Sequence, residues 1–249
     1  MPDAAVLIND LHKSYRGAFT AALNGLFLEV PQNTIYGLLG PNGAGKTTTL
    51  SIICGLFGAS GGSVQVMGYD TEKHKAEVLR HIGLVPQKIA LFGNLTCEEN
   101  LRYFGRLYQL SGSEIKKRIK DLLHLMNLEK HGDKNVSRYS GGMQRRANLI
   151  AALLHEPDIL ILDEPTAGVD VQSRALIISF LKEYHAQGKT ILYTSHLLDE
   201  AEHLCQAVSI IDEGKNVLSG TPAQLIGQTP GAAKLEDVFL AHTGHSIRD

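Results

Sequence analysis

The chain has 249 residues, of which 43% are hydrophobic and 20% charged, as in a globular protein of one large domain or two interleaved ones. Its 24 basic and 26 acidic residues leave a net charge of −2, so no overall basic field points to nucleic acid as a partner. The longest apolar runs fall far short of the roughly 20 residues that a membrane helix needs, and we expect no membrane span.

The N-terminal part alternates β-leaning runs with turns, and residues 6–8 and 26–30 are its clearest strands. Tyr15 follows the first of these runs, in a polar connector. An aromatic ring there can stack on a base, or it can be a half-buried residue of an ordinary turn. The residues alone leave both interpretations open.

A glycine-rich loop gives the strongest signal in the chain. It fits the pattern Gly-x-x-x-x-Gly-Lys-Thr and reads Gly40-Pro41-Asn42-Gly43-Ala44-Gly45-Lys46-Thr47-Thr48. A strand-like run, residues 34–39, precedes it and a helical pattern, residues 48–56, follows, which argues against a chance glycine-rich turn. Glycines let backbone N–H groups face an anion at the positive end of the helix. Lys46 adds a charge near the β- and γ-phosphates, and Thr47 offers a hydroxyl to Mg²⁺.

Residues 63–66 and 82–85 predict two further short strands, and the second leads to Gln87, a neutral amide. From residue 88 to 155 the pattern becomes helical. Thr96 opens a capping box, in which Thr96 and a glutamate three residues later satisfy each other's backbone N–H groups.

Two features of this helical stretch allow more than one interpretation. Residues 116–120 give one helix a basic face, which is either simply solvated or in contact with anionic headgroups or a partner. Ser140-Gly141-Gly142 stands directly before a helical pattern over residues 144–155. Such a turn aims N–H donors and a hydroxyl at an anion, although a helix N-cap with flexible glycines is the simpler meaning.

Acidic residues follow a continuous apolar run, residues 159–162, that predicts a buried parallel strand. Asp163 and Glu164 are costly there unless they face a cation or a polar site, and a Mg-nucleotide loop needs such a carboxylate. Asp170 caps the next predicted helix. His196 comes after a second apolar strand, at the end where ligands lie in open α/β sheets.

The remaining residues predict strands at residues 208–211 and 216–218 and a short helix at residues 222–226. A linker at residues 227–233 and a final helix at residues 234–242 follow.

In this order the motifs resemble those of ATP-binding cassette (ABC) ATPase subunits, and the resemblance covers nearly the whole chain. The matching segments are Tyr15 (the A-loop that stacks adenine), residues 40–48 (Walker A), Gln87 (Q-loop), residues 140–142 (signature), residues 159–164 (Walker B), Asp170 (D-loop) and His196 (switch histidine). The usual signature, Leu-Ser-Gly-Gly-Gln, has Met143 in place of its glutamine, and Gln144 stands next to it.

The resemblance implies an α/β fold of the P-loop NTPase type. It has a mainly parallel sheet core, an N-terminal antiparallel β subdomain and an inserted α-helical subdomain. The cassette would span residues 1–226, with the helical subdomain at about 88–156 and the rest at about 1–87 and 157–226. Residues 227–249 would form a C-terminal linker and short helix.

The resemblance also implies that two cassettes close head-to-tail over two Mg-ATP. Glu164 would polarise the attacking water and His196 would hold the γ-phosphate. The implied catalytic residues are Glu164, His196 and Lys46. The implied Mg²⁺ residues are Thr47, Gln87 and Asp163. The implied ATP contacts are Tyr15, residues 40–48, Gln87 and residues 140–142.

The helical insert near residues 95–101 and the ending near residues 235–244 resemble subunits of ABC-2 type exporters. A membrane permease, contacted through Gln87 and the helical insert, would then hold the chain at the cytoplasmic face of the membrane. One alternative is a cassette ATPase that acts on DNA or ribosomes, but no second cassette, long coiled coil or basic stripe supports it. The other is a non-hydrolysing cassette, which should lack Glu164 or His196.

Overall fold

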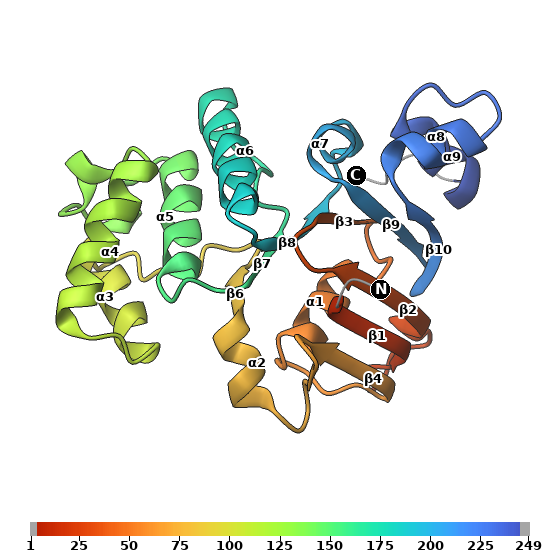
Figure 1. The fold of residues 1–249 in the computed structure, drawn as a ribbon, viewed down its shortest axis with the longest axis horizontal. Coiled ribbons are helices and arrows are strands. Elements are labelled where there is room, and N and C mark those ends of the chain that lie inside the picture. The colour runs from red at the N-terminus through yellow and green to blue at the C-terminus, as the bar shows by residue number, and fades with distance from the viewer. Residues whose placement is uncertain (1–3, 245–249) are drawn as a thin grey trace.

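The computed structural model describes residues 4–244, so residues 1–3 and 245–249, the outermost parts of the division expected above, lie outside it. Its strands form two sheets (Figure 1). The smaller sheet is antiparallel, with the strand order β2-β1-β4-β5. Its strands are β1 (Ala4–Lys13), β2 (Leu23–Pro31), β4 (Gly61–Val66) and β5 (Tyr69–Asp70).

The larger sheet has the strand order β10-β9-β3-β8-β7-β6 and is parallel except for β10, which pairs antiparallel with β9. Its strands are β3 (Ile35–Leu39), β6 (Ile82–Val85), β7 (Ile159–Asp163), β8 (Thr190–Ser195), β9 (Ala207–Asp212) and β10 (Lys215–Gly220). The predicted run at residues 159–162 is therefore a strand inside the parallel sheet, with neighbours on both sides.

Burial on both faces explains why this run is continuously apolar. Leu160 and Leu162 join one core cluster, whereas Ile159 and Ile161 join the other. The second cluster also holds α1 (Lys46–Ile53), which packs between the two sheets. The alternation follows from the two-residue period of a strand.

The insert between β6 and β7 contains three α-helices, α3 (Cys97–Leu107), α4 (Gly112–Leu125) and α5 (Gly141–Leu153), and two short 3-10 helices, Glu129–His131 and Val136–Arg138. In Figure 1 they gather at one end of the molecule, beside α6 (Val171–Ala186) and away from the antiparallel sheet. The predicted capping box at Thr96 is confirmed, since its hydroxyl accepts from the Glu99 N–H and the Glu99 carboxylate from the Thr96 N–H.

The C-terminal helices α8 (Pro222–Gln228) and α9 (Leu235–Thr243) occupy the positions predicted for them, although α8 extends two residues into the expected linker. Leu235, Val238 and Phe239 are buried in the same core cluster as Leu160 and Leu162. The sequence prediction missed the short elements β5, α2 (Lys75–His81) and α7 (Leu198–Leu204).

The fold class predicted from the resemblance is confirmed: a mainly parallel sheet, an antiparallel sheet and an inserted helical group form one α/β structure. No helix within residues 4–244 is both long and apolar enough to cross a bilayer.

Candidate active site

The carboxyl ends of parallel strands meet at one edge of the larger sheet. The glycine loop follows β3, Gln87 follows β6 and His196 follows β8, while Asp163 ends β7 with Glu164 next to it. These side chains therefore gather in one crevice. A cavity of about 310 Å³ lies there, lined by Ala22, Asn42, Gly43, Gly45, Lys46, Thr47, Thr48, Gln87 and Glu164.

The loop backbone takes a form that only glycine adopts easily. Gly43 and Gly45 have φ of 85° and 106°. A Cβ on Gly45 would also lie 2.7 Å from the carbonyl oxygen of Ala22. Gly45 caps α1 and offers no side-chain acceptor to its first N–H groups, so these donors and the positive end of the helix are directed at the cavity.

Lys46 begins α1 and its side chain is buried. Its ammonium donates to the carbonyl oxygens of Gly40 at 2.7 Å and Pro41 at 3.1 Å. Burial lowers the pKa of Lys46, and the nearby carboxylates of Glu164 and Asp163 act in the opposite direction. The cation is thus held inside the loop, next to the two acids.

Asp163 joins the loop to the sheet. The Thr47 hydroxyl donates to its Oδ2 at 3.1 Å, and the Thr194 hydroxyl lies 2.8 Å from its Oδ1. Both acids are buried, with 6% of Asp163 and 9% of Glu164 exposed. The buried carboxylate of Asp163 therefore has a hydroxyl partner on each oxygen, as burial requires.

Glu164 is held by partners that follow two other strands, β6 and β8. The Gln87 amide donates to its Oε2 at 3.0 Å, and Nδ1 of His196 lies 3.2 Å from the same oxygen. Its backbone has φ 49°, in the left-handed region, and its N–H donates to the carbonyl and hydroxyl oxygens of Thr194. Such backbone strain persists where the surroundings fix it, often at functional sites.

Thr47 and Asp163 fit a magnesium ion bound together with a phosphate. Two adjacent ligands of an octahedral Mg²⁺ at about 2.1 Å lie about 3 Å apart. The Thr47 hydroxyl and Asp163 Oδ2 are separated by 3.1 Å. The described residues contain no group of three or more His, Cys, Asp or Glu side chains that could hold a metal alone. Phosphate oxygens and waters would have to complete the shell.

Tyr15 lies at the rim of this crevice. Its hydroxyl is 3.3 Å from that of Thr48, and its ring is partly exposed. The Lys13 ammonium lies 5.3 Å from the ring centroid, and Phe57 packs edge-on at 6.3 Å. Base stacking by Tyr15 stays a prediction.

The structure does not bring Ser140, Gly141 and Gly142 to this crevice, because none of them is among the residues that line the cavity. Ser140 is exposed and caps α5, with its hydroxyl accepting from the Met143 N–H at 3.3 Å. The turn therefore opens elsewhere on the surface.

Gly142 fixes this turn against α6. A Cβ there would lie 2.3 Å from the Ser173 hydroxyl and 2.6 Å from Oδ2 of Asp170. Asp170 caps α6, as predicted, by accepting from the Ser173 N–H at 2.9 Å.

Helix α5 begins at Gly141, three residues before the start expected at residue 144, because Ser140 supplies its cap. The Gln144 amide donates to the carbonyl oxygen of Val136 at 3.1 Å, and Met143 packs against the core. Because Met143 has no amide and the Gln144 amide is bonded to Val136, neither residue offers a side-chain amide at the exposed turn.

Two residues of the site were missed in the sequence. Thr194 bonds to both acids, and its position just before Ser195-His196 could have indicated it. Arg145 donates to the carbonyl oxygen of Pro86 at 3.0 Å and so holds the residue before Gln87. Burial lowers the pKa of Arg145, and nothing in the helical pattern separates it from a solvated arginine.

The sequence pattern of the family described as "ABC transporter" matches residues 23–167. The linearmycin resistance ATP-binding protein LnrL of Bacillus subtilis is 42% identical over 209 residues, which cover 84% of this chain and 67% of that protein. The Nod factor export ATP-binding protein I of Paraburkholderia xenovorans is 40% identical over 236 residues, which cover 95% of this chain and 77% of that protein.

A solved structure of an ATP-binding cassette is also similar to most of this chain. The chain is similar to the dimeric, post-hydrolysis ATP-binding cassette MJ0796 bound to ADP and Pi, with a TM-score of 0.80 and 26% sequence identity. The similarity covers 87% of this chain and 98% of that one.

Proposed function

Because the chain belongs to the ABC transporter family, as an ATP-binding and ATP-hydrolysing subunit of the exporter type, we propose that it powers a separate membrane permease by closing on a second cassette. One observation carries the proposal. Glu164 and Asp163 are bonded to residues of the glycine loop and to residues that follow β6 and β8, in one crevice next to the N-terminus of α1.

Each of these side chains has a distinct task in hydrolysis. Lys46 and the N–H groups at the start of α1 bind the phosphates, and Tyr15 stacks on the base. Glu164 polarises the attacking water, with Gln87 and His196 fixing its carboxylate. Positioning and charge stabilisation supply most of the rate enhancement in such phosphoryl transfers.

Mg²⁺ fits this scheme through Thr47 and Asp163, with Gln87 nearby, and when bound it neutralises phosphate charge. Asp163 is pre-oriented for this task by the Thr194 hydroxyl. The protein part of the metal site thus consists of one hydroxyl and one carboxylate, supported by the amide.

The exposed Ser140 turn supports pairing with a second copy. It offers the N-terminus of α5 and a hydroxyl to an anion, away from the crevice of its own chain. In a head-to-tail pair each turn faces the partner's glycine loop, so each ATP lies between two chains. We propose a homodimer on this ground, since one chain carries both halves.

A complementation experiment tests this arrangement. Lys46→Ala removes the phosphate contact of one half-site, and Ser140→Arg blocks the other, so at ATP concentrations near the wild-type dissociation constant each variant alone should show almost no hydrolysis. A mixture forms mixed pairs with one intact composite site, and we expect it to regain about a quarter of the wild-type rate. A mixture as inactive as its components would overturn the composite site.

The exposed face of α3 supports a protein contact. Phe92 and Tyr103 pack edge-on with ring centroids 5.4 Å apart, and both are exposed together with Leu107. Aromatic residues of this kind are enriched at protein interfaces. We place the permease here, close to Gln87, which puts the chain at the cytoplasmic face of the membrane. The boundaries of the helical subdomain at residues 88 and 156, and the end of the cassette at residue 226, are also part of this proposal.

Crosslinking can test the contact without removing native cysteines. Cys54, Cys97 and Cys205 are buried, and burial raises the pKa of their thiols to about 12, about 11 and about 12. In a Tyr103→Cys variant the new cysteine should therefore be the reactive thiol. It should crosslink to the permease in the assembled transporter. Tyr69→Cys, on the antiparallel sheet, is the control, and equal crosslinking by both would contradict the placement.

A further inference from the structure

Charge is divided unevenly along this chain. Residues 88–155 contain 12 Lys and Arg and 6 Asp and Glu, which gives +6, whereas the whole chain carries −2. The remaining residues must therefore carry −8. The helical insert is the positive part of an otherwise acidic protein.

Three of the exposed basic residues of the insert lie on α4. Lys116, Lys117 and Lys120 are exposed and have no ion-pair partner among the described residues. Their spacing of one and four residues places them on one face of the helix, opposite the buried Ile115 and Ile119. We call these three lysines the α4 stripe.

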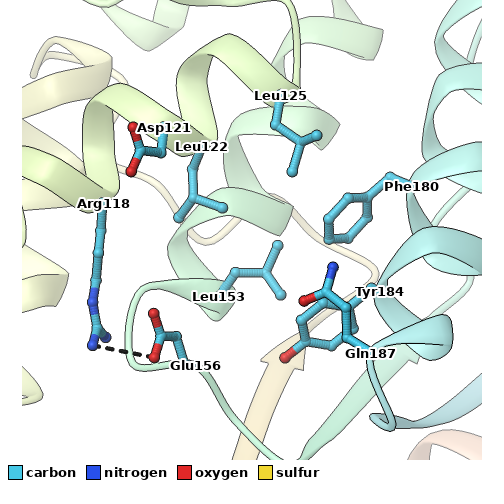
Figure 2. Close-up of a pocket in the computed structure, with 9 residues that line it drawn as sticks. All are labelled: Arg118, Asp121, Leu122, Leu125, Leu153, Glu156, Phe180, Tyr184 and Gln187. Atoms are coloured by element: carbon cyan, nitrogen blue, oxygen red, sulfur yellow. Dashed lines mark ion pairs between the residues drawn. The ribbon is translucent and has the colours of Figure 1, made fainter.

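The other charged side chains of α4 point elsewhere. Figure 2 shows Arg118 directed at Glu156, with which it forms an ion pair of 3.3 Å, in a cavity between α4 and α6. Asp121 lines the same cavity. Arg118, which the sequence placed on the basic face, therefore does not belong to it, and Glu114 is occupied in the cap of α4.

The composition of the α4 stripe favours lipid over protein as its partner. Lysine is depleted at protein interfaces, whereas clusters of basic residues bind anionic headgroups. The neighbouring helix α3 differs, because it exposes Tyr103 and Leu107 beside Arg106. In Figure 1 α4 lies at the outer edge of the insert, where a flat surface can reach it.

We infer that the α4 stripe binds the anionic headgroups of the membrane in which the permease lies. The inference rests on the proposed function, since the permease brings the insert to the bilayer. Direct binding of the stripe then helps to keep the insert against the membrane while the two cassettes open and close.

The test measures binding of the whole chain to vesicles by flotation, with phosphatidylcholine alone and with phosphatidylcholine mixed with phosphatidylglycerol. Each basic residue at such a surface strengthens binding about fivefold. The triple variant K116E/K117E/K120E should therefore lower the partition coefficient on mixed vesicles by at least about 100-fold. Raising the salt from about 0.1 M to about 0.5 M should weaken wild-type binding.

The control is K75E/K182E/K215E, which reverses three exposed lysines outside the insert and changes the net charge by the same amount. It should retain vesicle binding, and a K116Q/K117Q/K120Q variant should show an intermediate loss. Equal loss by both glutamate triples, or binding to phosphatidylcholine alone that matches the mixed vesicles, would overturn the inference.

ATP hydrolysis by the isolated cassette separates this inference from the proposed function, because neither triple touches the crevice. If wild type ignores mixed vesicles but K116E/K117E/K120E uncouples the assembled transporter, the stripe binds a protein and the lipid inference is wrong. If hydrolysis itself is absent in wild type, the proposed function fails instead.

Discussion

The glycine-loop crevice and the Ser140 turn are both anion-directed helix starts, but they are built in opposite ways. In the crevice Lys46, Asp163 and Glu164 are buried and each is bonded to other elements. Ser140 and Gly141 of the turn are exposed, and within residues 4–244 the Ser140 hydroxyl bonds only to the Met143 N–H of its own helix start. The side chains of the first region are already positioned without a ligand. The second region needs the surface of a partner to complete a binding site.

We relate this difference to two tasks: hydrolysis in the crevice and pairing of two chains at the turn. Groups that must act on a reacting bond are held in place by several contacts, which gives preorganisation. A surface that must bind and release a second molecule cannot be buried in its own chain. Substitutions in the crevice should therefore affect the rate of hydrolysis or nucleotide affinity, and substitutions at the turn should affect pairing and packing.

Glu164→Gln should have the largest effect. It keeps the shape of the side chain but removes the carboxylate that we propose polarises the attacking water, so hydrolysis should fall by about 10²–10⁴-fold. Nucleotide binding should persist, and an ATP-bound dimer should accumulate in size-exclusion chromatography. Normal turnover by this variant would disprove the role given to Glu164.

Lys46→Ala should come next. Loss of a charged donor to phosphate costs about 1.5–3 kcal/mol, so the dissociation constant for ATP should rise by about 10–150-fold in calorimetry. Lys46→Arg is a partial control, because it keeps the charge but not the fit between two carbonyl oxygens. An unchanged dissociation constant in the alanine variant would contradict the phosphate-loop assignment.

Gly142→Ala tests the packing of the turn, and Gly141→Ala is its matched control. The Cβ at residue 142 meets the Ser173 hydroxyl at 2.3 Å, while a Cβ at residue 141 meets nothing within 4 Å. Urea denaturation should show a loss of about 1–3 kcal/mol for the first variant. The second should be neutral or slightly stabilising, and equal losses would argue against the contact with α6.

Tyr15→Ala should raise the dissociation constant for ATP by about tenfold, since base stacking on an aromatic side chain contributes about 1–3 kcal/mol. Tyr15→Phe keeps the ring and loses only the contact with Thr48, so it should bind almost as wild type. If both variants bind equally poorly, the hydroxyl matters and the ring does not stack.

Met143→Gln should have the smallest effect. It restores the usual signature residue, yet Ser140 and the start of α5 already form the turn without it. We expect hydrolysis to change by less than about twofold, within the range of surface substitutions. A large gain would show that the missing amide limits the second half-site.

The resemblance implied the two sheet types, while the residues themselves predicted the order of the motifs and the capped starts of α3 and α6. These depend on local patterns such as capping boxes, apolar runs and glycine spacing. The sequence missed α2 and α7, which are short helices with few periodic positions, and it placed Arg118 on the basic face of its helix, whereas Arg118 pairs with Glu156. The direction of a long side chain on a half-buried helix depends on tertiary partners that no local pattern encodes.

Within the site, the sequence placed all the acids and the histidine near one sheet edge but could not give their bonds. That Gln87 and His196 meet on the same oxygen of Glu164 depends on the register of three strands. The supporting role of Thr194 was invisible for the same reason, because threonine in a buried strand ordinarily needs no explanation.

Thr194 has a consequence for motion. Its hydroxyl donates to one of two acceptors, the Leu162 carbonyl oxygen or Oδ1 of Asp163, and also accepts from the Glu164 N–H, so one buried side chain spans the ends of β7 and β8. His196 directly follows Ser195, the last residue of β8. We therefore expect a displacement of the histidine segment to shift Asp163 and Glu164 together, because Thr194 joins the ends of β7 and β8.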